Sequence, residues 1–324
     1  MRRHRIAVIA AAALIATVMA GCSTGTAKDA SSTDKKTITI AYASDNEAIP
    51  FVASVTDSVK KAASTAGDKL SVLDNGGDPA KAVQNARTFM ANQPDVFVEY
   101  NGTADSNGRI ERIAKEADVP VLAVQYPIGD NPLYAIDNKA VGETGGKLLG
   151  ETAAQKWGAG TAVKALMLAL PQGGQVQLDR RDGAQDAIAK ALKNVAFTDA
   201  DTKNDPATVT QITTDFLTAN PATKVVIWTH IDSAGQAIVS AVKAAGREDD
   251  VLVMSTGGSS TIFPDVRAGA PLVGTVDLFP ELWGPEIVKL ATKVARGDKV
   301  AAVTRPSKLA VLTADNIDTY YPQN

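Results

Sequence analysis

The order of apolar segments constrains the fold of this chain more than any other feature of the sequence. From Thr37 onward, short apolar runs of strand length alternate with longer segments whose apolar residues recur at helical spacing. In the first half, the runs that we interpret as strands are residues 38–43, 70–74, 96–100 and 119–124. Strands separated by single helices predict a parallel, doubly wound α/β sheet.

A second series of the same kind follows. Its predicted strands are residues 162–170, 224–229, 251–255, 272–278 and 309–312. The predicted helices are residues 51–66, 78–92, 110–116, 142–156, 180–192, 208–219, 231–246 and 285–297. Asp78 is expected to cap its helix, with Pro79 at the first helical position. Two α/β units followed by one extra stretch fit two lobes that share the end of the chain between them.

The first residues have the pattern of an export signal. The basic segment Met1–Arg5 precedes Ile6–Ala20, fifteen residues in which only Thr17 is polar. That length is short of the ~20 residues that a membrane-spanning helix needs, so we interpret residues 1–21 as a signal peptide. Its end, Met19-Ala20-Gly21-Cys22, resembles the lipobox of bacterial lipoproteins, in which the cysteine carries diacylglycerol.

Lipidation of Cys22 would anchor the mature chain on a membrane, since two acyl chains hold a protein there stably. The alternative is a plain signal peptide in which Cys22 is incidental. Residues 22–36 are small and polar without apolar periodicity, so we expect a flexible tether between the anchor and the folded body.

Composition excludes several classes of protein. The chain has 33 Lys and Arg against 36 Asp and Glu, so it lacks the basic excess of a nucleic-acid binder. Its cysteine and histidine residues are Cys22, His4 and His230, which excludes most zinc, iron–sulfur and disulfide architectures. We therefore expect no metal, no cofactor and no nucleic-acid partner.

Short motifs that suggest enzymes are incomplete. Gly142–Leu148 lacks the first glycine and the hydroxyl residue of a phosphate-binding loop. Ser58 and Lys61 have the Ser-x-x-Lys spacing of penicillin-recognising enzymes, but the companion motifs are missing and we place both on a helix surface. Asp199–Lys203 begins like a calcium loop and puts a lysine where an oxygen ligand is required. The sequence therefore does not predict an enzyme.

Several stretches, in order, resemble the type 1 periplasmic binding proteins, in particular the ribose- and galactose-binding group of ABC-transporter solute-binding proteins. They are residues 37–42 with Pro50-Phe51, residues 73–81, residues 118–121, residues 135–138 with Gly142 and Gly145-Gly146, and Asn220-Pro221 before the strand at 224–229. The resemblance covers residues 36–319. It implies two Rossmann-like lobes joined by three hinge strands, with a ligand between them.

The hinge strands are expected at Tyr134–Asn138, Thr275–Phe279 and Thr304–Lys308. The first lobe would then hold residues 37–136 plus 277–305, and the second lobe residues 137–276 plus 306–324.

In open α/β sheets, ligands bind beyond the carboxyl ends of the strands. Together with the resemblance, this rule selects ten candidate ligand-binding residues: Asp45, Asn46, Glu47, Phe51, Asn101, Gln125, Tyr126, Arg180, His230 and Asp277. The resemblance implies that Phe51 stacks on the apolar face of a sugar ring; the alternative is packing in the core. Arg180 could instead be a charge on a helix surface, and Asn101 could be a turn residue.

We expect His230 to hydrogen-bond the ligand as a neutral ring and, from its reference pKa of ~6.5, to make affinity change between about pH 5 and 8. The chain departs from the family elsewhere. Gln125-Tyr126 stands where pentose and hexose binders often place Asp-Arg, and Asn204 where a second aromatic wall falls.

These observations predict a monomeric, lipid-anchored solute-binding protein on the outer face of the bacterial cytoplasmic membrane. It would deliver a sugar or polyol to an ABC permease and its ATPase by hinge closure. The alternatives are a receptor subunit that presents a furanosyl signal or nucleoside to a membrane sensor, and an enzyme that uses carboxylates in the cleft.

Overall fold

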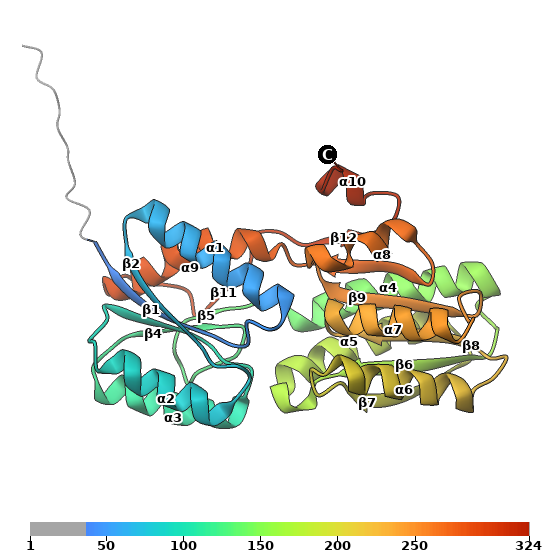
Figure 1. The fold of residues 1–324 in the computed structure, drawn as a ribbon, viewed down its shortest axis with the longest axis horizontal. Coiled ribbons are helices and arrows are strands. Elements are labelled where there is room, and N and C mark those ends of the chain that lie inside the picture. The colour runs from blue at the N-terminus through green and yellow to red at the C-terminus, as the bar shows by residue number, and fades with distance from the viewer. Residues whose placement is uncertain (1–36, 324) are drawn as a thin grey trace, which may run out of the picture. The chain divides into compact units, whose positions relative to one another are not determined.

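The computed structural model describes residues 37–323. The predicted signal peptide, the tether and Cys22 lie outside the described residues. Two six-stranded sheets, each flanked by helices, form two lobes that lie side by side (Figure 1).

The first sheet has the strand order β2-β1-β3-β4-β5-β11, and all of its pairings are parallel. Its strands are β1 (Thr39–Ser44), β2 (Lys69–Asp74), β3 (Val96–Tyr100), β4 (Val121–Val124), β5 (Leu133–Tyr134) and β11 (Val303–Thr304). Helices α1 (Pro50–Ala66) and α9 (Pro280–Ala295) cover one face, and α2 (Pro79–Met90) and α3 (Ala104–Glu116) cover the other (Figure 1).

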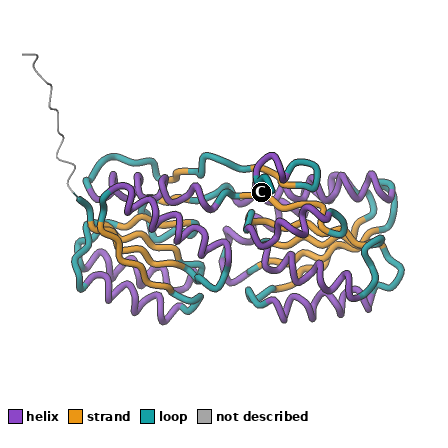
Figure 2. Tube along the Cα trace, turned by 45° about the horizontal axis from the view of Figure 1, so that its top comes forward, coloured by secondary structure: helices purple, strands orange, loops and turns teal. Residues whose placement is uncertain are grey.

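The second sheet repeats this order as β7-β6-β8-β9-β10-β12, with β12 antiparallel to β10. Its strands are β6 (Val163–Ala169), β7 (Val195–Asp201), β8 (Lys224–Thr229), β9 (Val251–Gly257), β10 (Leu272–Asp277) and β12 (Ala310–Leu312). The helices of this lobe are α4 (Asn138–Trp157), α5 (Gln175–Ala191), α6 (Pro206–Ala219), α7 (Asp232–Ala244), α8 (Phe263–Ala268) and α10 (Ile317–Tyr320), with single 3₁₀ turns at Pro171–Gly173 and Ser260–Ile262. Figure 2 shows both sheets sandwiched between helices.

The predicted fold class is confirmed, and so is the cap of α2, where the Asp78 side chain accepts from the backbone N–H groups of Ala80 and Lys81. Strand β7 was not predicted. It is an edge strand with half-exposed residues, so it lacks the continuous apolar run of the central strands. Helix α9 begins at Pro280 and contains Pro285, which the prediction had placed at the helix start.

Ser58 does not lie on an exposed surface as expected. It is buried where α1 packs on α9, its Oγ donates to the Glu281 carbonyl at 2.5 Å, and it accepts from the Gly284 N–H at 3.0 Å. Ser58 therefore joins two helices of the first lobe.

The chain passes between the two sheets three times. The first passage follows β5 and leads into α4, the second links β10 to α9, and the third links β11 to β12. The second passage contains Phe279 in the left-handed region, with φ 49° and ψ 60°, a conformation that bulky residues rarely adopt. None of the helices within residues 37–323 combines the length and the apolar character needed to span a bilayer.

Candidate ligand-binding site

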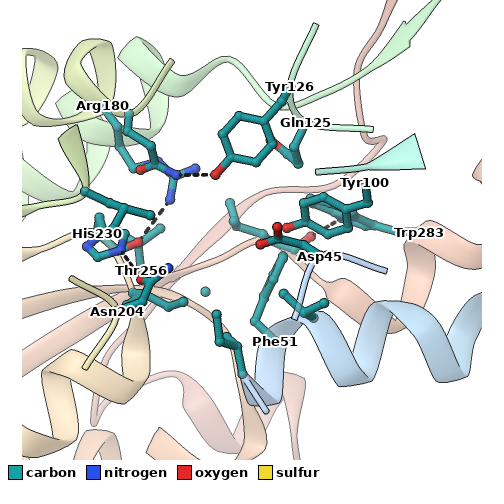
Figure 3. A pocket seen from close by; sticks show the side chains of 17 residues that line it. Asp45, Phe51, Tyr100, Gln125, Tyr126, Arg180, Asn204, His230, Thr256 and Trp283 are labelled. Atoms are coloured by element: carbon teal, nitrogen blue, oxygen red, sulfur yellow. Dashed lines mark hydrogen bonds between the residues drawn. The ribbon is translucent and has the colours of Figure 1, made fainter. Parts of the chain in front are cut away.

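A pocket of about 520 Å³, its mouth included, lies where the carboxyl ends of strands from both sheets meet (Figure 3). The lining residues are Asp45, Ile49, Phe51, Val52, Tyr100, Gln125, Tyr126, Leu170, Gln177, Arg180, Asn204, His230, Ile231, Thr256, Gly257, Leu278 and Trp283. The pocket is therefore built from both lobes, at the edge where open α/β sheets bind ligands.

Asp45 follows β1 and supplies the carboxylate of the pocket. One of its oxygens accepts from the Gly102 N–H at 2.7 Å, and the side chain is buried. Burial is the largest of the causes that raise the pKa of Asp45 to about 6; the Gly102 N–H lowers this pKa and the nearby Asp74 raises it. Asp45 therefore changes charge just below neutral pH.

Gln125 and Tyr126 follow β4. Gln125 has φ 62°, a left-handed conformation that costs free energy in a non-glycine residue. The Tyr126 hydroxyl accepts from Gln177 Nε2 at 2.8 Å, and the Tyr126 ring stacks on Tyr100 at 6.3 Å between centroids. Since Gln177 lies on α5 of the second lobe, this hydrogen bond joins the lobes across the pocket.

The apolar side of the pocket is aromatic. Phe51, at the start of α1, meets Trp283 of α9 edge to face, with ring centroids 5.2 Å apart. Trp283 also meets Tyr134 edge to face and donates its indole N–H to the Leu278 carbonyl at 2.7 Å. These contacts fix the Phe51 ring in one orientation, which favours stacking of a ligand ring.

Arg180 on α5 is buried and not a surface charge. Its Nε and Nη2 donate to Asn138 Oδ1 at 2.9 and 2.6 Å, and its Nη1 donates to the His230 carbonyl at 3.0 Å. Of the five N–H groups of a guanidinium, these bonds use three. The two others have no recorded partner among residues 37–323, and the side chain lines the pocket. Arg180 can therefore donate to a ligand.

His230 lies at the end of β8, where its Nδ1 is 3.4 Å from the Leu168 carbonyl and its Nε2 is 3.1 Å from Asn204 Oδ1 (Figure 3). Burial, together with the positive charge of Arg180, lowers the pKa of His230 to about 3. The expectation that His230 titrates between pH 5 and 8 is therefore wrong, because the ring stays neutral throughout that range.

Three buried polar atoms on the pocket wall have no hydrogen-bond partner within the described part of the chain. They are Gln125 Nε2, Gln177 Oε1 and Thr256 Oγ1. Buried polar groups are nearly always paired, so each of these is an open position for a ligand group. One is a donor, one an acceptor and one both, and this mixture matches hydroxyl groups, which donate and accept.

Four of the predicted site residues do not line the pocket. Asn46 accepts from the Ala48 N–H in the turn before α1, and Glu47 extends toward Lys60 at 4.0 Å. Asn101 is a turn residue: its amide donates to Ser106 and Asn107 at the start of α3.

Asp277 ends β10 but faces away from the pocket, where it accepts from the Phe279 N–H at 2.7 Å and from the Tyr321 hydroxyl at 2.9 Å. Gly258 leaves room for it, since a Cβ there would lie 1.8 Å from the Asp277 carboxylate. The pocket does hold Asp45, Phe51, Gln125, Tyr126, Arg180 and His230.

Sequence reasoning did not select Tyr100, Gln177 or Thr256. Tyr100 is the last residue of β3 and Thr256 the last but one of β9, so the carboxyl-end rule could have found both if it had included the final residues of each strand. Gln177 lies three residues before Arg180 on the same helix face, a spacing that could have suggested it. Within residues 37–323, no group of three or more His, Cys, Asp or Glu side chains is arranged to hold a metal ion.

Comparisons with known proteins agree with this geometry. The family model described as "Periplasmic binding protein domain" matches residues 40–299. The chain is 28% identical over 291 residues to the ribose import binding protein of Salmonella typhimurium, a match that covers 89% of this chain and 94% of that protein.

Two solved structures from Mycobacterium smegmatis share the fold. An ABC transporter solute binding protein with bound glycerol has a TM-score of 0.81 and 23% identity, covering 89% of this chain and 98% of that one. A second structure, in complex with β-D-fucofuranose, has a TM-score of 0.79 and 22% identity, covering 88% and 94%. The extent of the family match, together with a pocket between two doubly wound lobes, shows that this chain belongs to the periplasmic binding protein family.

Proposed function

We propose that this protein binds a sugar or a sugar-like polyol between its lobes and delivers it to an ABC permease. The observation that carries the proposal is the set of unpartnered donors and acceptors on the pocket wall beside an aromatic platform. A polyol ring can satisfy both, because its hydroxyls exchange hydrogen bonds while its C–H face packs on Phe51. The ribose and fucofuranose bound by relatives are ligands of this class.

Hinge closure is the mechanism that this proposal implies. A ligand that contacts Asp45 and Gln125 on one lobe and Arg180 on the other binds the closed arrangement better than an open one. Differential contact of this kind shifts the population toward closure, and a permease can recognise the closed form. No chemical change of the ligand is part of this cycle.

A thermal-shift screen of sugars, polyols and nucleosides would identify the ligand, and Phe51→Ala tests how it is held. Loss of the platform should cost about 1–3 kcal/mol of binding free energy, or roughly ten- to a hundredfold in affinity by calorimetry. Phe216→Ala, at a half-buried position on α6 outside the pocket, is the control and should bind as the parent does. Normal binding by folded Phe51→Ala protein would remove the stacking model.

The affinity for the ligand should fall at acid pH because of Asp45. If its ionised carboxylate accepts a ligand hydroxyl, only the ionised form binds well, and its pKa is raised to about 6. Affinity should then be roughly tenfold weaker at about pH 5 than at about pH 7. Asp45→Asn should bind more weakly near neutrality but lose this acid dependence. His230→Asn should keep it, because His230 is already neutral in this range. An equally steep acid limb in Asp45→Asn would assign the effect to another group.

Cys22 anchors the protein to the outer face of the cytoplasmic membrane in this proposal, through the lipobox-like end of the signal sequence. Cys22→Ala should shift the protein from the membrane fraction to the released fraction, or leave its signal uncut, because no diacylglycerol can be attached. Cell fractionation with blotting measures this, with Ser23→Ala as the control. Equal membrane fractions for the two variants would argue against the anchor.

A further inference from the structure

A hydrogen-bonded cluster spans the second passage of the chain between the lobes. The Tyr321 hydroxyl lies 2.9 Å from Asp277 Oδ2 and 3.1 Å from Glu281 Oε1. Asp277 ends β10 of the second sheet, whereas Glu281 is in the first turn of α9, which packs on α1 in the first lobe. One side chain from the end of the chain therefore contacts both sides of a hinge.

Tyr321 itself is held by the second lobe. Its ring lies 4.4 Å from the ring of Phe263 on α8, and its carbonyl accepts from Arg267 Nη2 at 2.7 Å. Arg267 also donates to Asp318, and Ile317 is buried in the core of this lobe. Figure 1 shows α10 beside α8 accordingly. The bond to Glu281 is thus a link from the second lobe to the first.

The backbone at this hinge is strained and tightly packed. Phe279 is in the left-handed region, which is unfavourable for a bulky residue. Its ring stacks on Tyr321 at 6.4 Å and lies near Tyr320 at 5.9 Å. The Lys308 Nζ sits 3.8 Å from the Phe279 ring centroid, in a cation–π contact from the third passage. A residue in a strained conformation persists only where the surrounding contacts stabilise it. Around Phe279, Tyr320 and Tyr321 of the C-terminal segment provide such contacts.

We propose that Tyr321 is a positioning residue for lobe closure: by joining Asp277 to Glu281 it stabilises the arrangement in which the pocket is enclosed. The same structure contains the Gln177–Tyr126 hydrogen bond across the pocket, so the cluster forms in an arrangement where the lobes touch. This inference rests on the proposed function only in assuming that closure accompanies binding. None of its residues lines the pocket.

The cluster also contains a titratable carboxyl group outside the pocket, that of Asp277. Burial is the largest of the causes that raise the pKa of Asp277 to about 7. The hydrogen bonds from the Phe279 N–H and the Tyr321 hydroxyl lower this pKa, and the negative charges of Glu281 and of the buried Asp232 on α7 raise it. The other groups around the cluster are the Tyr321 hydroxyl and the Lys308 ammonium, which lies over the adjoining Phe279 ring. Below this pKa, protonated Asp277 can donate to the Tyr321 oxygen while the Tyr321 O–H donates to Glu281.

Above this pKa, the ionised Asp277 carboxylate is buried beside the negative charge of Glu281, which costs free energy, while the Tyr321 hydroxyl stabilises it as a hydrogen-bond donor. The closed arrangement should therefore be disfavoured as the pH rises through about 7, and less so while Tyr321 donates to Asp277. This gives closure an alkaline limit, opposite in sign to the acid limb expected from Asp45.

The test measures closure directly, without ligand. Nitroxide labels at the exposed positions Gln84 on α2 and Thr214 on α6, in the full chain with Cys22→Ser, report the distance between the lobes by electron–electron resonance. Tyr321→Phe keeps the ring and removes the hydroxyl, and Tyr320→Phe is the matched control next to it. A net hydrogen bond of about 0.5–1.5 kcal/mol predicts that Tyr321→Phe changes the open-to-closed ratio roughly two- to tenfold toward open.

Measuring the closed fraction at two pH values gives a second readout, which would not change if Tyr321 had only a structural role. In the parent, the closed fraction should be larger at about pH 5.5 than at about pH 8.5, since Asp277 titrates between them. Tyr321→Phe should enlarge that difference, because the hydroxyl that stabilises ionised Asp277 is lost. Asp277→Asn, which mimics the protonated acid, should stay closed at both pH values.

Identical distance distributions for Tyr321→Phe and Tyr320→Phe at both pH values would overturn the proposal. The measurement needs no ligand, so a failed sugar screen would count against the proposed function and leave this result untouched. A melting temperature for each variant confirms that the labelled chain is folded.

Discussion

Replacing Arg180 by methionine is expected to weaken ligand binding by roughly 100-fold. Hydrogen bonds to a charged group contribute about 1.5–3 kcal/mol each, and Arg180 has two N–H groups free to bond a ligand in the pocket. The substitution also leaves Asn138 Oδ1 and the His230 carbonyl without their donor, so Asn138 and His230 are no longer held in position beside the pocket. Calorimetric titration with the ligand found in the thermal-shift screen measures the loss.

Arg181 offers a matched control on the same helix. It pairs with Asp182 and Asp199 at the surface and is absent from the pocket lining, so Arg181→Met makes the same change of charge away from the site. This variant should bind as the parent does. Equal affinities for the two variants would show that the buried guanidinium does not touch the ligand.

The fold could be predicted because the central strands are buried on both faces. Runs such as residues 121–124 and 251–254 are continuous and apolar, and helices separate the strands along the chain. Strand β7 was not predicted because it pairs on one side only and contains polar residues such as Asp199 and Asp201.

The site could be predicted as far as the carboxyl ends of strands define it. Asp45, Gln125 and His230 follow their strands directly and line the pocket. Asp277 also ends a strand, but residues alternate between the faces of a sheet, and its face is turned toward Tyr321. Trp283 reaches the pocket from a helix of the first lobe, which only the packing of α9 on α1 determines.

The pKa of His230 shows a further limit of prediction from the sequence. Its sequence position was sufficient to place it in the pocket, but its pKa depends on burial and on the charge of Arg180, fifty residues away. A reference pKa therefore predicted a titration that the folded environment suppresses. Burial also helps to raise the pKa values of Asp45 and Asp277, to about 6 and about 7, so these two carboxyl groups titrate near neutral pH.

Substitution of Gly142 by alanine is expected to destabilise the protein and to weaken binding together. Gly142 lies on α4 where α5 approaches most closely: an added Cβ would be 1.9 Å from the Arg180 carbonyl oxygen and 3.0 Å from the Ala184 nitrogen. Because the clash is with backbone, the helices must move apart. Overpacking of this kind costs about 1–3 kcal/mol, and more where nothing can yield.

The movement would carry Arg180 away from the pocket, since the obstructed atom is its own carbonyl. Gly142 and Gly146, two glycines of the stretch that superficially resembles a phosphate loop, thus allow α5 and its guanidinium to approach α4. We expect the melting temperature to fall by several degrees, at roughly 2–4 °C per kcal/mol, and the affinity to fall with it.

Gly108→Ala is the matched control. Gly108 is an exposed helical glycine on α3, and a Cβ there meets nothing within 4 Å. Alanine is favoured over glycine in a helix by about 1 kcal/mol, so this variant should melt higher than the parent. The two Gly→Ala changes are chemically identical and should shift stability in opposite directions. Should Gly142→Ala melt at or above the parent temperature, the close approach of α4 and α5, and with it the explanation of how Arg180 reaches the pocket, would be wrong.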